Sequence, residues 1–164
     1  MIRVDHAGEF GALRIYQGQL AVLGRQRSTP VEAIRRMAGQ EQKHFAVFDQ
    51  MVKDRGVRPT VLEPLWHVAG FTLGAATAIF GEKAAMACTV AVEEVIDRHY
   101  QRQIETMPED ESGLMKTIVD FRADELEHHD LAIGHGARET PGYRLLTSVI
   151  RACCRTAISL SEKI

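Results

Sequence analysis

Hydrophobic residues recur three and four positions apart along most of the chain, which is the spacing of an amphipathic helix. The pattern predicts six helices, near residues 2–24, 30–55, 64–80, 83–107, 111–137 and 141–162. Alternation with a period of two is nowhere sustained long enough to indicate a strand. We therefore expect an all-α fold.

Proline and glycine mark the helix boundaries. Thr29 to Glu32 has the form of a capping box, with proline at the first helical position. Pro64 and the pair Thr140–Pro141 are expected to open two further helices. Gly81 and Pro108 are expected to end the third and the fourth.

Six ionisable residues fall inside the hydrophobic stripes of these helices. On the second helix, for example, Glu41 and His44 continue the stripe that contains Met37 and Phe48. Buried carboxylates are costly, and two divalent cations would balance four of them. Protonation or nearby arginines are alternative sources of balance. The six residues are Glu9, Glu41, His44, Glu93, Glu125 and His128.

An internal repeat relates these residues to one another. A shift of 84 residues aligns Glu9 with Glu93, and it also aligns the two Glu-x-x-His motifs that begin at Glu41 and Glu125. The same shift aligns Tyr16 with Tyr100. The repeating unit is therefore three helices, at about 1–80 and 85–164, within a single domain 1–164.

This pattern predicts a ferritin-like four-helix bundle with two additional apolar or amphipathic helices. One Glu from each of two helices, plus Glu-x-x-His from each of two others, is the ligand set of di-iron carboxylate bundles. Mixed Glu and His ligands suit iron, although manganese or zinc fits the same ligands. We expect Glu41 and Glu125 to bridge the two metals. Solvated surface charge is the weaker interpretation, because both motifs recur at one spacing.

Neighbouring residues are candidates for supporting roles. Asp124 and Gln40 precede the paired glutamates and can accept a hydrogen bond from the histidine of the opposing helix. Tyr16 and Tyr100 can relay electrons or protons, but packing in the core is the more common role of such tyrosines. The remaining histidines are expected on the surface or beside the ligands: His6, His99, His129 and His135.

Composition narrows the class of protein further. A net charge of −2 gives no electrostatic footprint for nucleic acid, and a hydrophobic content of 45% is typical of globular proteins. The odd cysteine count, Cys88, Cys153 and Cys154, favours a reducing compartment in which all three pack as small hydrophobic residues.

Two of the predicted helices carry none of the six ionisable residues. Residues 64–81 contain no Asp, Glu, Lys or Arg, so helix packing and membrane contact are equally plausible for them. Residues 141–162 form a basic amphipathic pattern that suits an anionic membrane surface. Such a pair of helices would suit an apolar substrate that enters from a bilayer.

The motifs resemble those of the demethoxyubiquinone hydroxylases over essentially the whole chain. The resemblance rests on Asp5-His6-Ala7-Gly8-Glu9, Gln40-Glu41, Arg58-Pro59-Thr60-Val61, the run from Ala85 to Glu94, the run from Asp124 to Asp130, and the closing run from Ala157 to Ile164. It implies a monooxygenase that hydroxylates the ring of 3-demethoxyubiquinol in ubiquinone biosynthesis. It also implies that all six residues named above are iron ligands.

The same resemblance implies partners and a location. We expect two iron ions, electrons from NADH or through the quinone itself, and a lipid quinone substrate. Helices 64–80 and 141–162 are expected to make peripheral contact with the mitochondrial inner membrane on its matrix side, or with a bacterial inner membrane on its cytoplasmic side. A eukaryotic member would work with a lipid-binding accessory protein in a ubiquinone-biosynthesis complex.

Two rival functions use the same ligands. Ferritin-like iron storage needs no organic substrate, and the uncharged helix argues against it because a storage shell has little use for such a surface. A membrane-associated scaffold with a structural metal would hold its metal without consuming dioxygen. The repeat of carboxylate-rich ligands argues against this second rival.

Overall fold

The computed structural model describes residues 1–164 and contains six α-helices and no strand, which confirms the all-α prediction. The helices are α1 (Ile2–Leu23), α2 (Thr29–Asp54), α3 (Glu63–Ile79), α4 (Glu82–Thr106), α5 (Ser112–Gly134) and α6 (Tyr143–Lys163). Two short 3-10 helices, Glu109–Glu111 and Ala137–Glu139, lie in the last two connections.

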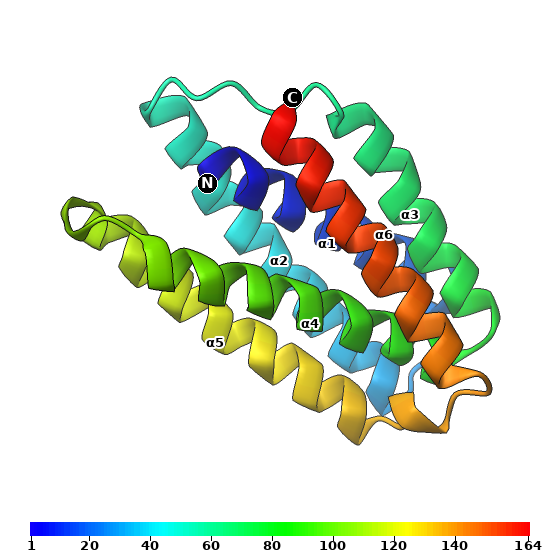
Figure 1. The fold of residues 1–164 in the computed structure, drawn as a ribbon. Coiled ribbons are helices and arrows are strands. Elements are labelled where there is room, and N and C mark those ends of the chain that lie inside the picture. Colours follow the sequence, from blue (N-terminus) through cyan, green and yellow to red (C-terminus); the bar gives the residue numbers. More distant parts are fainter.

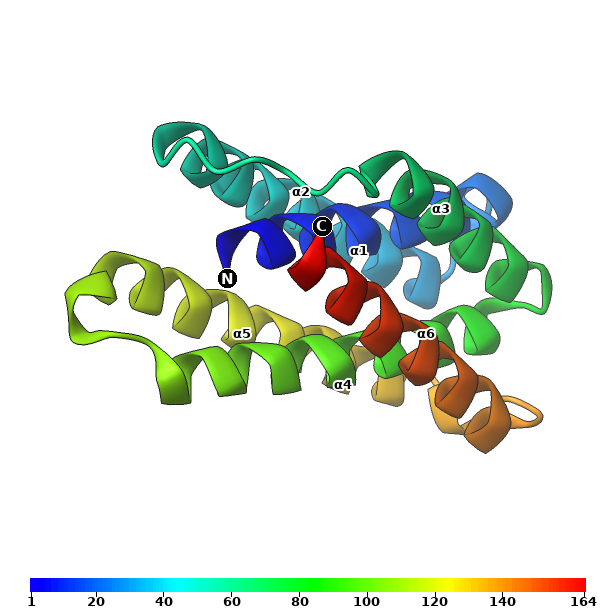
Figure 2. The ribbon, with the colours of Figure 1, turned by 45° about the horizontal axis from the view of Figure 1, so that its top comes forward.

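Four of the helices form a bundle, and the other two cover it. Helices α1 and α2 pack as one pair and α4 and α5 as another, while α3 lies along α1 and α6 lies along α4 (Figures 1 and 2). The three helices α1, α2 and α3 thus pack against one another in the same way as α4, α5 and α6. This arrangement is the one expected for a ferritin-like bundle built from a repeated three-helix unit.

Some helix boundaries differ from the prediction. Helix α2 is capped by Ser28, whose Oγ accepts a hydrogen bond from the Val31 N–H at 3.4 Å, so Thr29 already lies inside the helix. Helix α5 ends at Gly134 rather than near residue 137, and α6 begins at Tyr143 rather than 141. The cause is the pair Gly136 and Gly142, whose φ angles of 84° and 71° lie outside the helical region.

The apolar core is divided into two clusters. One contains Phe48, Ile96, Tyr100, Leu114 and Ile118, and the other contains Tyr16, Ile34, Met37, Met86 and Ala132. Along α2 and α5 the predicted ligands lie between the residues of one cluster and those of the other. The ionisable groups are therefore enclosed by apolar side chains at both ends of the bundle.

The backbones of α1 and α3 lie unusually close to each other because glycines line the contact. A Cβ atom on Gly74 would lie 1.9 Å from the Ile15 carbonyl oxygen, and one on Gly18 would lie 2.1 Å from that of Phe71. Only hydrogen fits at either position. The crossing fixes α3 against α1, which carries Glu9.

The cysteine prediction is wrong at one position. Cys88 is buried and Cys154 is half-buried, but Cys153 is exposed on α6. All three are free thiols. Burial raises the pKa of both Cys88 and Cys154 to about 12, so these two remain protonated at neutral pH.

We predict that Gly74→Ala lowers the free energy of unfolding by about 1–3 kcal/mol, because the added methyl group forces the two backbones apart. Gly39→Ala on α2 is the matched control: a Cβ there meets no atom within 4 Å. That change should raise the free energy by about 0.5–1 kcal/mol, since alanine restricts the unfolded chain. Chemical denaturation measures the free energy of unfolding of both variants. Equal effects of the two substitutions would contradict a close contact between the backbones of α1 and α3 at Gly74.

Candidate metal centre

The six predicted ligands lie together in the middle of the bundle. They form two groups whose ligand atoms all lie within 4.8 Å of one another. The first group is Glu9, Glu41, His44 and Glu125, and the second is Glu41, Glu93, Glu125 and His128. Glu41 and Glu125 belong to both groups, which is the placement expected of bridging carboxylates.

The helices place these side chains by their spacing. Glu41 and His44 are three residues apart on α2, and Glu125 and His128 are three apart on α5, so each pair faces the same side. Helix α1 supplies Glu9 and α4 supplies Glu93. None of the six side chains is more than 3% exposed.

Both histidines direct Nδ1 toward the carboxylates. His44 Nδ1 lies 3.2 Å from Glu125 Oε1 and 3.5 Å from Glu9 Oε2. His128 Nδ1 lies 3.2 Å from Glu41 Oε1 and 3.2 Å from Glu125 Oε2. The inner nitrogen of each ring therefore faces the same space as the carboxylate oxygens.

Many of these buried atoms have no hydrogen-bond partner. They include both carboxylate oxygens of Glu41, one oxygen each of Glu9, Glu93 and Glu125, and Nδ1 of His44. Buried polar atoms without partners are rare in native proteins and call for an ion or another explanation. Oxygen and imidazole donors that converge without partners fit two divalent transition-metal ions.

The ionisable groups of the cluster shift one another's pKa values. Burial raises the pKa of Glu9, Glu41 and Glu93, and repulsion from Glu125 adds to each rise. Burial opposes the charge of His44, but its contacts with Glu125 and Glu9 outweigh this and raise its pKa to about 11. The contacts of Glu125 with both histidines likewise outweigh burial and lower its pKa to about 2. Protons and metal ions thus compete for the same atoms.

The outer nitrogen of each histidine contacts a residue that precedes an opposing glutamate. His44 Nε2 lies 3.0 Å from Asp124 Oδ2, and His128 Nε2 lies 3.2 Å from Gln40 Oε1. If each Nε2 donates to these oxygens, Nδ1 keeps its lone pair for a metal. Such contacts had been expected from the position of these residues in the sequence.

Two buried tyrosines link the halves of the repeat. The hydroxyl of Tyr16 on α1 donates to Glu93 at 2.6 Å, and that of Tyr100 on α4 donates to Glu9. Burial, together with the charge of those glutamates, raises the pKa of both phenols well above the usual value. Both therefore stay protonated and fix one oxygen of each carboxylate.

A further buried group lies beside Glu9. His99 Nε2 is 3.1 Å from Asp5 Oδ1, and Gln103 Nε2 donates to the same oxygen at 2.5 Å. His99 was named from the sequence, but Asp5 and Gln103 were not recognised as its partners. The available signal was helical spacing: Asp5 precedes Glu9 by one turn of α1, and Gln103 follows His99 by one turn of α4.

Other candidate residues lie away from the cluster. Glu94 points outward and accepts a hydrogen bond from Arg151 at 2.8 Å, whereas Glu93 points inward, as the repeat indicated. His129 is partly exposed and contacts Asp130 at 2.9 Å. His6 is buried, with its Nε2 3.5 Å from Asp49.

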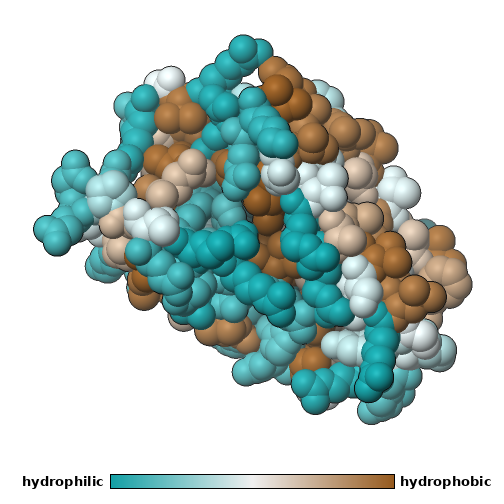
Figure 3. Space-filling view, in the orientation of Figure 1, coloured by the Kyte–Doolittle hydropathy of each residue, from teal (hydrophilic) through white to brown (hydrophobic).

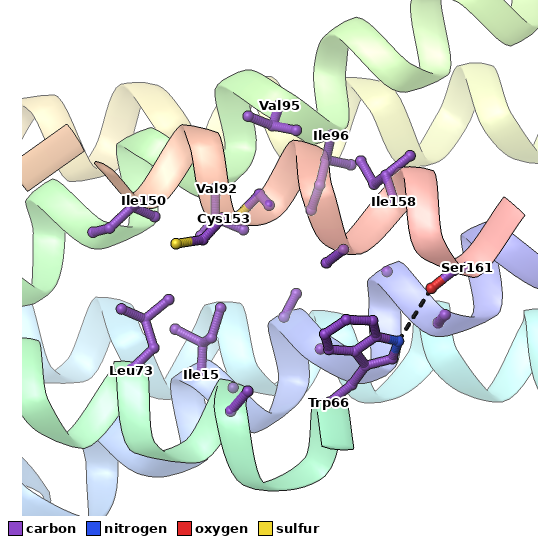
Figure 4. Close-up of a pocket in the computed structure, with 18 of the residues that line it drawn as sticks. Ile15, Trp66, Leu73, Val92, Val95, Ile96, Ile150, Cys153, Ile158 and Ser161 are labelled. Atoms are coloured by element: carbon purple, nitrogen blue, oxygen red, sulfur yellow. Dashed lines mark hydrogen bonds between the residues drawn. The ribbon is translucent and has the colours of Figure 1, made fainter. Parts of the chain in front are cut away.

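An apolar pocket of about 300 Å³ is lined in part by α1 and α4, the helices that carry Glu9 and Glu93. Its walls come from α1 and α3 on one side and α4 and α6 on the other (Figure 4). Gly8 and Val92 line it and are the chain neighbours of Glu9 and Glu93. The indole N–H of Trp66 is satisfied by Ser161 at 3.1 Å, so the lining is almost entirely apolar. Sequence periodicity did not reveal this pocket, because its walls combine the ligand-free faces of four helices.

We predict that Glu41→Gln stabilises the chelator-treated protein while it weakens metal binding. A folded-state pKa raised above the unfolded value of about 4.5 destabilises the fold only above that pH. The gain in stability should therefore be absent near pH 4 and should appear as a higher melting temperature at pH 7. Thermal unfolding at both pH values measures it.

Glu127→Gln provides the control, because that side chain is 53% exposed and pairs with Arg36 on the surface. This control should not raise the thermal stability at pH 7 as Glu41→Gln does. It should also leave the number of bound metal ions unchanged. A Glu41→Gln protein that is less stable at pH 7 would contradict the electrostatic analysis.

Known proteins of one family resemble this chain over nearly its whole length. The family model described as Ubiquinone biosynthesis protein COQ7 matches residues 1–161. The chain is 56% identical over 163 residues to 3-demethoxyubiquinol 3-hydroxylase of Rhodospirillum rubrum, covering 99% of this chain and 76% of the relative.

Eukaryotic relatives are nearly as similar. The chain is 53% identical over 168 residues to NADPH-dependent 3-demethoxyubiquinone 3-hydroxylase, mitochondrial, of Homo sapiens, covering 100% of this chain and 76% of the relative. It is 40% identical over 179 residues to 5-demethoxyubiquinone hydroxylase, mitochondrial, of Saccharomyces cerevisiae, covering 100% and 77%. These findings confirm the resemblance seen in the sequence motifs: the chain belongs to the ubiquinone biosynthesis protein COQ7 family.

Proposed function

We propose that this chain is a 3-demethoxyubiquinol 3-hydroxylase of ubiquinone biosynthesis, and that it acts through two iron ions held by the six buried ligands. The observation that carries the proposal is the pair of overlapping groups that share Glu41 and Glu125. A structural metal site is normally closed around one ion, whereas shared carboxylates suit two ions with open positions. The bacterial and human relatives described above are named as hydroxylases of demethoxyubiquinol or demethoxyubiquinone.

The reaction replaces a ring C–H bond by C–OH. One atom of dioxygen enters the ring and the other leaves as water, which consumes two electrons and two protons from a reductant. When bound, the two iron ions would supply the place where dioxygen is reduced, without a separate organic cofactor. The protein must then hold the metals, exclude bulk water and keep protons at defined atoms.

The residues around the ligands are suited to these tasks. The two apolar clusters close both ends of the site, so ionic interactions inside it are weakly screened. Tyr16 and Tyr100 each hold a proton on a hydroxyl that bonds to a ligand carboxylate. Asp124 and Gln40 orient the two imidazole rings.

The apolar pocket is our candidate for the quinone site. Its lining offers no charged side chain, which suits a substituted ring and a polyprenyl tail. It shares α1 and α4 with the metal cluster, so a ring bound there approaches the side of the bundle that carries Glu9 and Glu93. Val149 of α6 both lines the pocket and is 53% exposed, which provides a route from the surface.

Apolar side chains on the surface suggest how such a substrate arrives. Hydrophobic residues gather over α3 and the adjoining side of α6 (Figure 3). Leu65, Ile79 and Phe80 are 52%, 72% and 84% exposed, and Leu145 of α6 is 72% exposed. No helix has the length and hydrophobicity required to span a bilayer. We infer peripheral contact through helices 64–80 and 141–162, with basic residues of α6 facing anionic lipid.

The reductant and location follow from the same proposal. NADH was expected from the resemblance, while the printed name of the human relative specifies NADPH for that protein. The yeast and human relatives are named as mitochondrial, and for a eukaryotic chain we infer the matrix face of the inner membrane. A bacterial chain would lie on the cytoplasmic side of the inner membrane. For a eukaryotic chain, a lipid-binding accessory protein would deliver the quinone within a biosynthetic complex.

The hydroxylase is tested with iron-loaded protein, a short-tailed demethoxyquinone, NADH or NADPH in separate arms, and isotopically labelled dioxygen. We expect one labelled oxygen on the product ring, detected by mass spectrometry. Glu41→Gln should reduce this signal by at least about a hundredfold, and Glu127→Gln should leave it unchanged.

Oxygen consumption without labelled quinone would instead favour iron storage. Assembly of the protein into a particle of the size of a storage shell would further support that function. Metal retention without any oxygen consumption would favour the scaffold. Neither rival is supported by the names of the relatives.

The pocket is tested separately. Ala69 lines it from α3 and is exposed at its outer edge, so Ala69→Trp can fill the cavity without replacing a core residue. We expect its KM for a long-tailed substrate to rise about tenfold, the equivalent of about 1.4 kcal/mol, with little change in kcat. Val119→Trp, at a 46% exposed position on α5 away from the pocket, is the control. An unchanged KM in Ala69→Trp would exclude this cavity as the quinone site.

A further inference from the structure

The internal repeat gives the metal cluster an approximate twofold symmetry. Tyr16 of the first unit donates to Glu93 of the second, and Tyr100 of the second donates to Glu9 of the first. Each histidine directs Nδ1 inward and Nε2 outward. The two groups of ligands are alike in residue type, so differences between the two positions must come from the surrounding residues.

The symmetry breaks first at the partners of the histidines. Asp124 and Gln40 are related by the shift of 84 residues, but one is a carboxylate and the other a neutral amide. Asp124 faces His44 at 3.0 Å, and Gln40 faces His128 at 3.2 Å. A carboxylate acceptor makes the imidazole a stronger donor to a metal than an amide does, and such partners typically alter metal affinity tenfold or more.

The symmetry breaks a second time at a buried residue near Glu9, which belongs to the same position. Asp5, which is 2% exposed, has Thr89 as its equivalent in the repeat, and the hydroxyl of Thr89 is buried without a partner. Asp5 lies one turn before Glu9 on α1, and Tyr100, which bonds to Glu9, follows His99, the partner of Asp5, on α4. His99 and Gln103 both contact the Asp5 carboxylate, whereas Asp124, which is 41% exposed, contacts the ligand His44 directly.

We propose that the two metal positions are unequal, and that the position held by Glu9 and His44 binds its ion more tightly and fills first. Asp124 is the main positioning residue for this difference, through His44. The proposal rests on the two-metal site of the proposed function. It assigns an order of loading, from the charge of residues that do not themselves reach the metals.

The test isolates each position in the full-length chain. His128→Ala leaves the group that contains Glu9 and His44, while His44→Ala leaves the group that contains Glu93 and His128. Chelator-treated variants are titrated without oxygen with Co²⁺, whose absorption reports coordination directly. We expect His128→Ala to bind one Co²⁺ about tenfold more tightly than His44→Ala does.

Exchanging the partners then identifies the cause. Asp124→Asn should weaken Co²⁺ binding about tenfold in the His128→Ala protein and have little effect in the His44→Ala protein. Gln40→Glu is the reciprocal change and should strengthen binding in the His44→Ala protein. Equal affinities of the two single-site variants, the reverse order, or an equal effect of Asp124→Asn in both backgrounds would each overturn the proposal. Circular dichroism and thermal unfolding establish that every variant is folded.

The chain with all six ligands provides a measurement that does not depend on the histidine variants. It should take up Co²⁺ in two resolved steps, and Asp124→Asn should merge them. A single step with two ions bound in the unmodified chain counts against the proposal. These titrations need no quinone, so unequal positions without hydroxylation would reject only the proposed function. Hydroxylation with equal positions would reject only this inference.

Discussion

The fold is organised around the cost of burying four carboxylates and two imidazoles in one place. Each of the six groups is almost completely removed from water, and several of their atoms have no partner within the protein. Such a cluster persists only where the surrounding packing is strong enough to hold it, and here one apolar cluster lies at each end. The destabilisation is concentrated where the chemistry is expected, which is the usual relation between stability and function in an enzyme.

The polar shell around the cluster limits this cost and keeps the geometry fixed. Tyr16 and Tyr100 satisfy one oxygen each of Glu93 and Glu9, and they do so across the two units of the repeat. The outer nitrogens of the histidines are also satisfied. What remains without partners is a set of atoms that point toward a common space, and this concentration distinguishes a binding site from poor packing.

Periodicity was sufficient to predict the helices and the inward direction of the six ligands, because helical spacing determines which side chains share a face. It was less reliable at the helix ends, where Ser28 rather than Thr29 caps α2 and where Gly136 and Gly142 set the limits of α5 and α6. The link between Asp5 and His99 and the apolar pocket were not found, because both depend on how distant helices pack. Helical spacing places Asp5 one turn from Glu9, but a single sequence does not indicate which residue of a distant helix it contacts.

Each group of ligands draws on both halves of the chain. The group around His44 takes Glu125 from the second unit, and the group around His128 takes Glu41 from the first. An ion bound at either position would therefore link the two units through its ligands. The backbone joins these units only through the short turn at Phe80 and Gly81. Separation of the units would then require release of the ions, so metal supply would affect how long the protein stays folded as well as its capacity to react.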